Sequence, residues 1–505
     1  MTPNTAPRPI AVALLNLNGL GLGYLHLERF RRWLAHGAVT ANLAALTWHS
    51  ATLGAPPIWE SILGLWLLWM VLDGWRQARK QARFTSQVSR SWAPLAVAVV
   101  IIGLEAGGLW WYRAQAQAEF IRGQTAYELG DAGLASRHLG QVISTYALSH
   151  APYLPLAREH WKESQSLLLA DDLWQKQDYS RAALYYEAHL SAYPDGPFAR
   201  RAATQASEVY SQWAAGLLAE GNYQVAIEKY RLILARYPQT APGQEAAQQE
   251  AEAHLAWARQ LAQAGEYALA VDKLQIVLEE FSGTQMAAQA ETELADLFTA
   301  AGQKLNANSP CDAAPILAAF AAGDSSWAAE ANALMPQAFY GCGQAEHRAE
   351  RYATAITAYE TLIANYPNSP LIPEAQAALV DARVADIEAK GTSELPPPQR
   401  SGSAPAGVAE VVISNDSPEQ LEVLLSGPGS QSLTMEKCGP CQTYFVAPLS
   451  CPEKGPQATV TLTPGRYKVV VRAISDPSVR PWSGTWNLDS GNEYFNCFFI
   501  IKSLR

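Results

Sequence analysis

The feature that most constrains this fold is a pattern of small residues that recurs about every 44 residues through the middle of the chain. Six alanines hold one register, with separations of 47, 44, 44, 44 and 41 residues: Ala135, Ala182, Ala226, Ala270, Ala314 and Ala355. Twelve positions before each alanine stands a second small residue: Gly123, Ala170, Ala214, Ala258, Gly302 and Gly343. Such a unit buries its apolar face only against its neighbours, so the pattern predicts a stack of repeats.

Two further positions make the pattern more specific. Four residues after the alanine, every copy except the one with Ala318 has a larger side chain: Leu139, Tyr186, Tyr230, Leu274 and Tyr359. Twelve residues after the alanine comes Pro194, Pro238 or Pro367 in three copies. Small residues at facing positions let an antiparallel helix pair approach closely, and proline ends the second helix. The sequence therefore predicts about six helix pairs over residues 114–390.

These small, small, large and proline landmarks resemble the tetratricopeptide repeat. The copies are longer than the usual ~34 residues, and the extra residues follow the proline, so we expect a first helix lengthened by two to three turns. The endings Arg236-Tyr237-Pro238 and Asn365-Tyr366-Pro367 are similar to those of bacterial envelope proteins, in particular the Tol–Pal coordinator and the outer-membrane-assembly lipoproteins. The resemblance implies an α-solenoid whose concave surface binds a protein or peptide.

Two kinds of side chain are candidates for that binding surface. Trp213 and Trp257 both lie 13 residues before their alanines, and we expect them to pack in the core rather than to line a groove. Groove residues are expected on the opposite face of each first helix. The candidates for partner binding are Arg200, Arg201, Gln205, Gln244, Gln248 and Gln249.

Residues 1–113 contain four apolar stretches, at roughly 9–27, 34–53, 57–73 and 93–112. Each is close to the ~20 residues that span a ~30 Å hydrocarbon core, so we expect a membrane domain with about four transmembrane helices. Glu60 and Asp73 are expected at the interfaces. Glu105 and His49 lie at similar depth, where they can form a structural hydrogen bond between helices or belong to an ion path.

Basic residues lie in two of the three loops between these stretches: Arg29, Arg31 and Arg32 in the first, and Arg76, Arg79, Lys80, Arg83 and Arg90 in the third. The middle loop, residues 54–57, has none. Because cytoplasmic loops carry the excess of Lys and Arg, both basic loops are predicted to be cytoplasmic. The protein is then a multi-pass cell-membrane protein in which everything after residue 112 is extracytoplasmic.

Two of the six cysteines lie in the repeats. Cys311 takes the place of the tyrosine that opens the second helix in other copies, and Cys342 takes the place of Trp213 and Trp257. These places should touch, because one second helix begins beside the end of the next first helix. We therefore predict a Cys311–Cys342 disulfide, which fits an oxidising compartment. Two free buried cysteines are the alternative.

The other four cysteines, Cys438, Cys441, Cys451 and Cys497, lie near the C-terminus. The Cys-Gly-Pro-Cys spacing at 438–441 is typical of a zinc knuckle or a redox site. A redox site would open a helix, whereas the neighbouring residues favour strand and loop, and a zinc site would need a second close pair. Two disulfides are the favoured interpretation, with zinc and redox chemistry as alternatives, and the pairing stays open among three possibilities.

Beyond the repeats, residues 391–406 have the composition of a Pro/Ser/Gly linker. From there the apolar pattern alternates with period two, and residues 407–505 predict a small, disulfide-braced antiparallel β-sandwich. Its strands are expected at Val408–Ser414, Glu419–Leu425, Ala458–Leu462, Tyr467–Ala473, Trp482–Leu488 and Tyr494–Ile501. Trp482 and Trp486, with Arg480 and Tyr494 nearby, are expected to pack in the core; stacking on a sugar ring or a peptide is the alternative.

Composition and motifs limit the function. Residues 114–505 hold 27 Lys and Arg against 43 Asp and Glu, so no large basic surface is available for nucleic acid. The sequence has no Ser-His-Asp arrangement, paired-carboxylate signature, phosphate loop or His-x-x-x-His site, so we expect neither an enzyme nor a cofactor or metal site. The whole predicts a mainly α, membrane-anchored scaffold of a bacterial cell envelope that binds protein or peptide partners. The alternative is an envelope sensor or transporter accessory whose membrane helices act on ions or lipid.

Overall fold

The computed structural model describes residues 6–84, 91–307, 309–323, 326–446, 448, 450–452 and 454–501, so Arg90 lies outside the described residues. The chain divides into two compact units, Met1–Glu250 and Ala251–Arg505. The first unit contains α1 (Pro9–Leu15), α2 (Leu22–His26), α3 (Phe30–Thr52), α4 (Ile58–Ala82), α5 (Ala93–Glu128), α6 (Ala132–Ser144), the short 3₁₀ helix η1 (Ala147–Ser149), α7 (Leu154–Gln175), α8 (Tyr179–Ala192), α9 (Ala199–Ala219), α10 (Tyr223–Arg236) and the start of α11 (Ala241–Ala264).

Within its described residues, the second unit contains the end of α11, six further helices and the strands. The helices are α12 (Tyr267–Glu280), α13 (Gln285–Asn306), α14 (Pro310–Ala321), α15 (Ala328–Arg348), α16 (Tyr352–Asn365) and α17 (Ile372–Lys390). Long and short helices alternate from α7 to α16. The long helices have 21 to 24 residues and the short ones 12 to 14, which confirms the lengthened first helix.

The small residues of the repeat make room for the large ones. A Cβ atom on Gly343 would lie 2.6 Å from Cζ of Tyr359, and one on Gly123 would lie 2.7 Å from Cγ of Leu139. Both large side chains are fully buried. In these two repeats, the glycine of the first helix therefore faces the bulky residue of the second helix.

The fifth copy has a different register from the one expected. Helix α14 begins at Pro310, so its fourth residue is Ala313, just as Ala182 is the fourth residue of α8. Ala313 and Leu317 are completely buried, whereas Ala314 and Ala318 are partly exposed. In the partner helix, Ala301 is buried and Gly302 faces open space. The landmarks of this copy are thus one residue earlier, and Leu317 supplies the large residue that Ala318 lacks.

The structure contains only part of the membrane domain that the sequence predicted. Among the described residues, two helices, α4 and α5, are long and apolar enough to cross a membrane, and only 11% and 6% of their apolar windows are buried. Helix α3 has sufficient length, with 23 residues, but is less apolar. The first expected span is broken into α1 and α2 by residues 16–21, where Gly19 and Gly21 have φ values of +74° and +68°. Glycine tolerates this left-handed backbone, which no α-helix contains.

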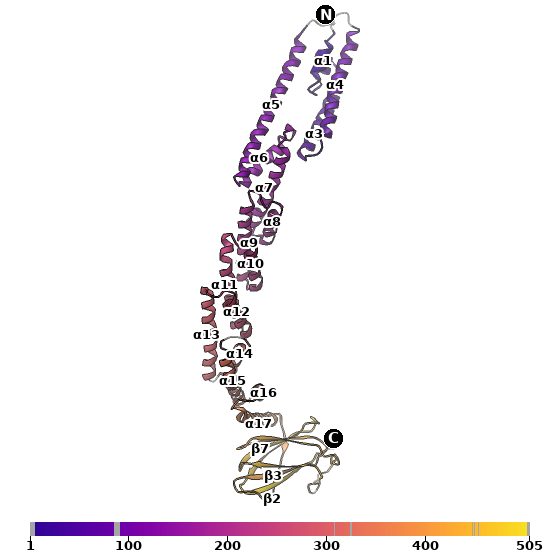
Figure 1. The fold of residues 1–505 in the computed structure, drawn as a ribbon. Helices are drawn as coiled ribbons and strands as arrows, with labels where there is room; N and C mark the ends of the chain where they lie inside the picture. Colours follow the sequence, from indigo (N-terminus) through magenta and orange to yellow (C-terminus); the bar gives the residue numbers. More distant parts are fainter. Residues whose placement is uncertain are drawn as a thin grey trace. The chain divides into compact units, whose positions relative to one another are not determined.

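Helix α5 passes through the expected domain boundary at residue 113. It runs without a break from Ala93 to Glu128, and its second half is the first helix of the first repeat (Figure 1). Tyr112 lies at the junction and donates a hydrogen bond from its hydroxyl to the backbone oxygen of Thr145, at 2.8 Å. The apolar segment and the first repeat therefore share one continuous helix rather than a linker.

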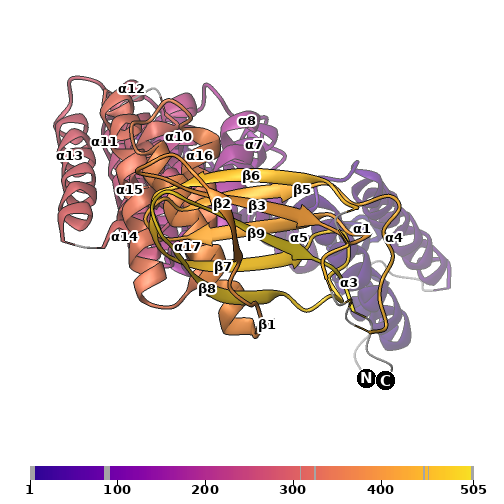
Figure 2. The ribbon, with the colours of Figure 1, turned by 90° about the horizontal axis from the view of Figure 1, so that it is seen from below.

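The C-terminal residues form two facing sheets, which we call the β-domain. The strands are β1 (Ser393–Glu394), β2 (Gln399–Ser403), β3 (Ala409–Asn415), β4 (Leu421–Ser426), β5 (Gln431–Met435), β6 (Gln457–Leu462), β7 (Gly465–Ala473), β8 (Trp482–Leu488) and β9 (Asn492–Phe498). One sheet has the order β1-β8-β7-β4-β5 and the other β2-β9-β3-β6, with strands of the two sheets running along one another (Figure 2). Alternate residues such as Val411, Val423 and Tyr467 meet in one core between them.

Two findings correct the expected sandwich. The sheets are mixed rather than purely antiparallel, because β1 pairs with β8 and β3 pairs with β9 in parallel. Residues 391–406 are not a free linker, since they supply β1 and β2. Between these strands Leu395 is buried, and the backbone oxygen of Pro396 accepts a hydrogen bond from Nε1 of Trp486 at 3.2 Å. This proline-rich segment therefore crosses from one sheet to the other, which its composition did not indicate.

The last helix of the repeats also belongs to the β-domain. Helix α17 lies on the outer face of the sheet that contains β7 (Figure 1), where Val380, Val384 and Ile387 pack against Leu424 and Val470. Polar contacts frame this apolar patch, since Arg383 donates to the Glu422 carboxylate at 3.3 Å and Arg472 donates to it at 2.6 Å. The repeats and the β-domain are therefore joined by a packed interface.

We predict that Glu422→Gln lowers the free energy of unfolding of this region by about 1 to 2 kcal/mol. Glu422 is buried and holds two charge-assisted hydrogen bonds, each worth about 1.5–3 kcal/mol when desolvated, but both arginines are partly exposed and the loss is correspondingly smaller. Urea unfolding of the full chain measures it. The matched control is Glu388→Gln, which removes a more exposed pair with Lys468 and should cost less than about 0.5 kcal/mol. If both variants lost the same free energy of unfolding, the larger contribution assigned to the buried Glu422 contacts would be wrong.

Candidate functional site

The six predicted groove residues have different roles in the structure. Arg200 and Gln244 are exposed on α9 and α11, and Gln248 is exposed as well. Two of the candidates form hydrogen bonds within the chain. Arg201 donates to the Asp171 carboxylate at 2.7 Å, and Gln249 accepts from the Ser211 hydroxyl at 3.4 Å. Gln205 is partly buried. Of the candidates, Arg200 and Gln244 therefore remain the side chains best placed to meet a partner.

A tyrosine–carboxylate–arginine contact, which sequence patterns did not reveal, recurs between neighbouring helices of the first unit. Tyr186 donates its hydroxyl to Asp171 at 2.5 Å, and Asp171 also accepts from Arg201. In the same way, Glu187 accepts from Tyr210 at 2.7 Å and from Arg236 at 2.6 Å. Burial, reinforced by the hydrogen bond to Asp171, raises the pKa of Tyr186, so the phenol stays protonated and keeps donating. These contacts hold adjacent helices together.

Trp213 and Trp257 are not core residues, contrary to expectation. Each is partly exposed, and a lysine ammonium lies over its ring: Lys229 is 4.4 Å from the centroid of Trp213, and Lys273 is 4.7 Å from that of Trp257. Both lysines lie three residues after the landmark alanine. Because a lysine recurs there, these two repeats each carry a partly buried cation–π pair, worth about 0.5–2 kcal/mol.

A cluster of buried and partly buried titratable groups lies in the first two repeats. Tyr127 donates its hydroxyl to Glu163 at 2.5 Å and stacks on His160, with ring centroids 3.8 Å apart. On the next helix, Nδ1 of His189 lies 2.6 Å from the Ser166 hydroxyl. Burial raises the pKa of Glu163 and lowers the pKa values of both histidines. The cluster disfavours charge on all three groups.

We predict that these two histidines make the repeats less stable in acid. Their pKa lies below 6.5 in the folded state and at 6.5 when unfolded, so the unfolded chain binds protons first as the pH falls. The free energy of unfolding should therefore decrease below about pH 6.5. Urea unfolding at pH 7.5 and 5.5 measures the change, and the double variant His160→Gln/His189→Gln should show a smaller difference between the two values.

Glu163 affects the pH dependence of the free energy of unfolding in the opposite direction, so its replacement provides a second test. Its pKa is raised on folding, so the folded state takes up a proton at higher pH than the unfolded state does, and acid favours folding through this group. Glu163→Gln should therefore steepen the loss of stability between pH 7.5 and 5.5. A pH dependence that neither variant alters would show that the cluster does not control acid stability.

All six cysteines are paired: Cys311 with Cys342, Cys438 with Cys441, and Cys451 with Cys497. The first pairing is the one predicted, although the shifted register puts Pro310 rather than Cys311 at the tyrosine position. Cys438 and Cys441 lie in a loop and not at the start of a helix, which disfavours redox chemistry. Among the described residues, no group of His, Cys, Asp and Glu is arranged to hold a metal ion.

The acidic residues of the apolar segment have partners that were not expected. Asp73 on α4 accepts from the Tyr24 hydroxyl at 2.9 Å, from Gln77 at 3.2 Å and from Arg32 at 3.3 Å. Glu60 lies 3.3 Å from Nε2 of His150. Both carboxylates were expected to be solvated at an interface. Glu105 and His49, the pair considered earlier, are both exposed in the described structure.

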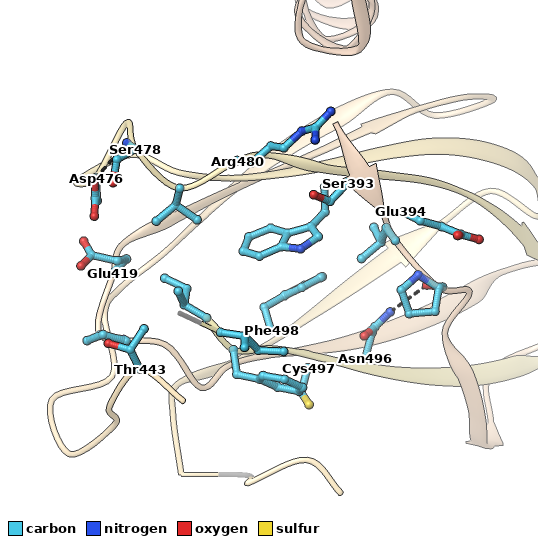
Figure 3. Close-up of a pocket in the computed structure, with 18 residues that line it drawn as sticks. Ser393, Glu394, Glu419, Thr443, Asp476, Ser478, Arg480, Asn496, Cys497 and Phe498 are labelled. Atoms are coloured by element: carbon cyan, nitrogen blue, oxygen red, sulfur yellow. Dashed lines mark hydrogen bonds between the residues drawn. The ribbon is translucent and has the colours of Figure 1, made fainter. Parts of the chain in front are cut away.

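The β-domain contains a cavity of about 660 Å³ between the two sheets (Figure 3). Its lining comes from segments far apart in sequence: residues 393–396, 418–419, 443, 476, 478–480, 482 and 496–501. Trp482 and Phe498 both line the cavity, and Glu419 and Asp476 lie together at one end (Figure 3). Of the four residues expected near one another here, Trp482 and Arg480 line the cavity, whereas Trp486 and Tyr494 are buried in the core.

Residues 337–369 match the family model of the tetratricopeptide repeat. This segment covers the second half of α15 and all of α16, including the contact between Gly343 and Tyr359. No curated protein matches the chain significantly. With the series of long and short helices, the match supports a tetratricopeptide-repeat protein, and repeats of this kind mediate protein–protein interaction.

Proposed function

We propose that this protein is a membrane-anchored, extracytoplasmic scaffold that binds protein or peptide partners in a bacterial cell envelope, and that it is not an enzyme. The observation that carries the proposal is the series of helix pairs, one of which matches the tetratricopeptide repeat at 337–369. A stack of such pairs offers a long surface for an extended partner. The envelope setting is supported by the repeat endings at Tyr237-Pro238 and Tyr366-Pro367.

The exposed apolar helices support anchoring in a membrane. Large side chains such as Leu65, Leu104 and Trp110 are 67%, 71% and 73% exposed, which would be unfavourable in water over so long a surface. The arginines that follow the apolar part of α4 favour a cytoplasmic position for that end. Three disulfides support an oxidising compartment for the rest of the chain.

Orientation is tested by cysteine labelling in intact cells. Arg400 is exposed in the β-domain and Arg79 lies at the basic end of α4. A membrane-impermeant maleimide should label an Arg400→Cys variant in intact cells, and an Arg79→Cys variant only after the membrane is opened. The reverse labelling pattern would refute the proposed topology.

Partner binding is tested by site-specific photo-crosslinking of the full chain in its membrane. A photoreactive amino acid at Arg200 or Gln244 should give a protein adduct of one size. The same amino acid at Glu410, on β3 of the β-domain, is the matched position that should not give this adduct. Absence of adducts from both repeat positions would argue against a scaffold that binds through this surface.

A second candidate function is an envelope sensor or transporter accessory whose membrane helices act on ions or lipid. The Asp73 network favours it, because a carboxylate with three donors close to a broken helix is typical of a functional polar site in a membrane. The test uses cells in which the unaltered chain replaces the deleted protein. If Asp73→Asn or Glu105→Gln no longer restored normal growth to these cells but still gave the photo-crosslinked adduct, this function would be favoured over the scaffold.

A further inference from the structure

We propose that the chain binds anionic phospholipid headgroups through a basic surface at one end of its apolar helices. This surface, which we call the basic end, consists of six cationic side chains: Arg29, Arg31, Arg76, Arg79, Lys80 and Arg83. The inference rests on the membrane anchoring proposed above and goes beyond it, because it names the class of lipid and the residues that select it.

The first apolar stretch brings these residues together, because it approaches and leaves α4 at the same end. Just after α1, Asn16 donates from Nδ2 to the backbone oxygen of Met70 on α4, at 3.2 Å. Nearer the start of α1, Val12 packs with Leu27 and with Ala78 of α4. Helix α1 therefore runs antiparallel beside α4 as far as Met70 (Figure 1), and the chain returns through α2 to the level of Ala78. A helix that crossed the membrane would place the two ends of the stretch far apart.

The basic residues of α3 and α4 consequently meet at this end, which also includes the start of α5. Arg29, which precedes α3, comes directly after the return of the chain. Cζ of Arg8 lies 3.9 Å from the centroid of the Trp92 ring, just before α5, and Cζ of Arg79 lies 4.5 Å from that of Trp75. Because tryptophan is enriched where a membrane meets water, these rings mark the level of the headgroups.

The spacing of residues along α4 agrees with this level. Leu72 is the last exposed leucine of the helix, and Arg76 and Arg79 lie about 6 and 10 Å beyond it at ~1.5 Å per residue. The polar layer on each side of the hydrocarbon core is about 5–8 Å thick. Both guanidinium groups can therefore reach lipid phosphates while Leu72 stays among the acyl chains.

Acidic side chains of the protein do not neutralise the basic end. Residues 1–33 and 70–98 contain nine Lys and Arg but only two acids, Glu28 and Asp73, and Asp73 is paired with Arg32 at 3.3 Å. Within the part of the chain that the structure describes, none of the six cations forms an ion pair. Residues 1–5 and 85–90, which lie outside the described residues, contain no Asp or Glu, so they have no carboxylate to supply.

Anionic phospholipids match this surface in charge and in shape. The phosphate of a phosphatidylglycerol headgroup accepts charge-assisted hydrogen bonds from guanidinium groups, and its acyl chains lie against exposed apolar side chains such as Leu72. Clusters of Lys and Arg beside membrane helices attract anionic lipids in this way. A zwitterionic headgroup carries the same phosphate together with a cation, which the basic end repels. A soluble anion lacks acyl chains and would gain only exposed charge contacts, which are weak.

Lipid selection by the full chain tests the proposal. The chain is inserted into vesicles of equal parts phosphatidylglycerol and phosphatidylcholine and extracted in mild detergent, and the lipids that stay bound are counted by mass spectrometry. Phosphatidylglycerol should exceed phosphatidylcholine about fivefold, and the excess should fall below about twofold in 1 M salt, where the Debye length is about 3 Å. A chain that does not insert refutes the membrane anchoring together with this proposal. An inserted chain that holds both lipids equally overturns this proposal alone.

Variants locate the selection at the basic end. Arg76→Gln/Arg79→Gln should reduce the excess of phosphatidylglycerol by about threefold. The matched control, Arg113→Gln/Arg137→Gln, removes two exposed arginines beyond the other end of the apolar part of α5 and should leave the excess unchanged. Equal effects of the two double variants, or displacement of the lipid by an equal concentration of glycerol phosphate, would overturn the proposal. The comparison of the two lipids on the unaltered chain decides the matter even if a variant fails to fold.

Discussion

Replacing both Cys451 and Cys497 by alanine is expected to lower the free energy of unfolding of the β-domain by about 4 kcal/mol. A disulfide stabilises mainly by restricting the unfolded chain, and the effect grows with the length of the loop it closes, from about 3 kcal/mol for 15 residues to about 4.7 for 100. The two cysteines are 46 residues apart. Cys497 lies on β9 in the middle of its sheet, so this bond also holds Cys451, which precedes β6, against that sheet.

The Cys438/Cys441 pair provides the matched control. It closes a loop of only three residues, and the same relation gives its removal a cost of about 1.5 kcal/mol. Hydrogen exchange of the β7 amides in the full chain, followed with increasing urea, reports the stability of the β-domain separately from that of the repeats. If both double-alanine variants lost the same stability, the long-range pairing of Cys451 with Cys497 would be wrong.

Gly343→Ala is expected to destabilise the repeats by about 1 to 3 kcal/mol, the range for overpacking a filled core. The added Cβ atom would overlap the ring of Tyr359, which is 1% exposed. Neither side can move easily, since the ring is buried and the glycine belongs to a helix in direct contact with it. Alanine favours the helix itself by up to about 1 kcal/mol, so a net loss of stability can only come from this clash.

Gly302→Ala is the control and also tests the shifted register. Gly302 lies in the same kind of helix, one copy earlier, but a Cβ atom there would meet nothing within 4 Å. This variant should gain about 0.5–1 kcal/mol. If instead Gly302→Ala were destabilising to the same extent as Gly343→Ala, the original register with Ala314 would be right. Hydrogen exchange of α14 and α16 under urea measures both variants.

Local patterns made much of the fold predictable. The small–large landmarks recur because each repeat has the same packing requirement, so Ala182, Tyr186 and their equivalents lie where expected in every copy but the fifth. The alternating runs at Tyr467–Ala473 and Trp482–Leu488 became β7 and β8 with nearly the expected bounds. The Cys311–Cys342 pairing followed from the contact between neighbouring repeats. In each case, residues close in sequence or in adjacent units determine the outcome.

Other features escaped prediction because composition does not report backbone geometry. The first apolar stretch appeared long enough to span a membrane, yet Gly19 and Gly21 break it. In the fifth repeat, a spacing of 44 residues was assumed, whereas the buried small residues Ala301 and Ala313 both lie one residue earlier. A copy that is shorter by one residue before its first landmark shifts all its landmarks together, and the exposed and the buried alanines look alike in the sequence.

The sequence by itself therefore determined the repeats, which are alternating helices whose small residues face large ones. It also determined the β-domain that follows them and one disulfide. The tertiary structure decided how distant segments meet. It brought the proline-rich residues 393–403 into both sheets, paired β3 with β9 in parallel, and collected Glu419, Asp476 and Trp482 around one cavity. Periodicity records the face that a residue presents within its own element, but only the packing of the whole domain determines which other face it meets.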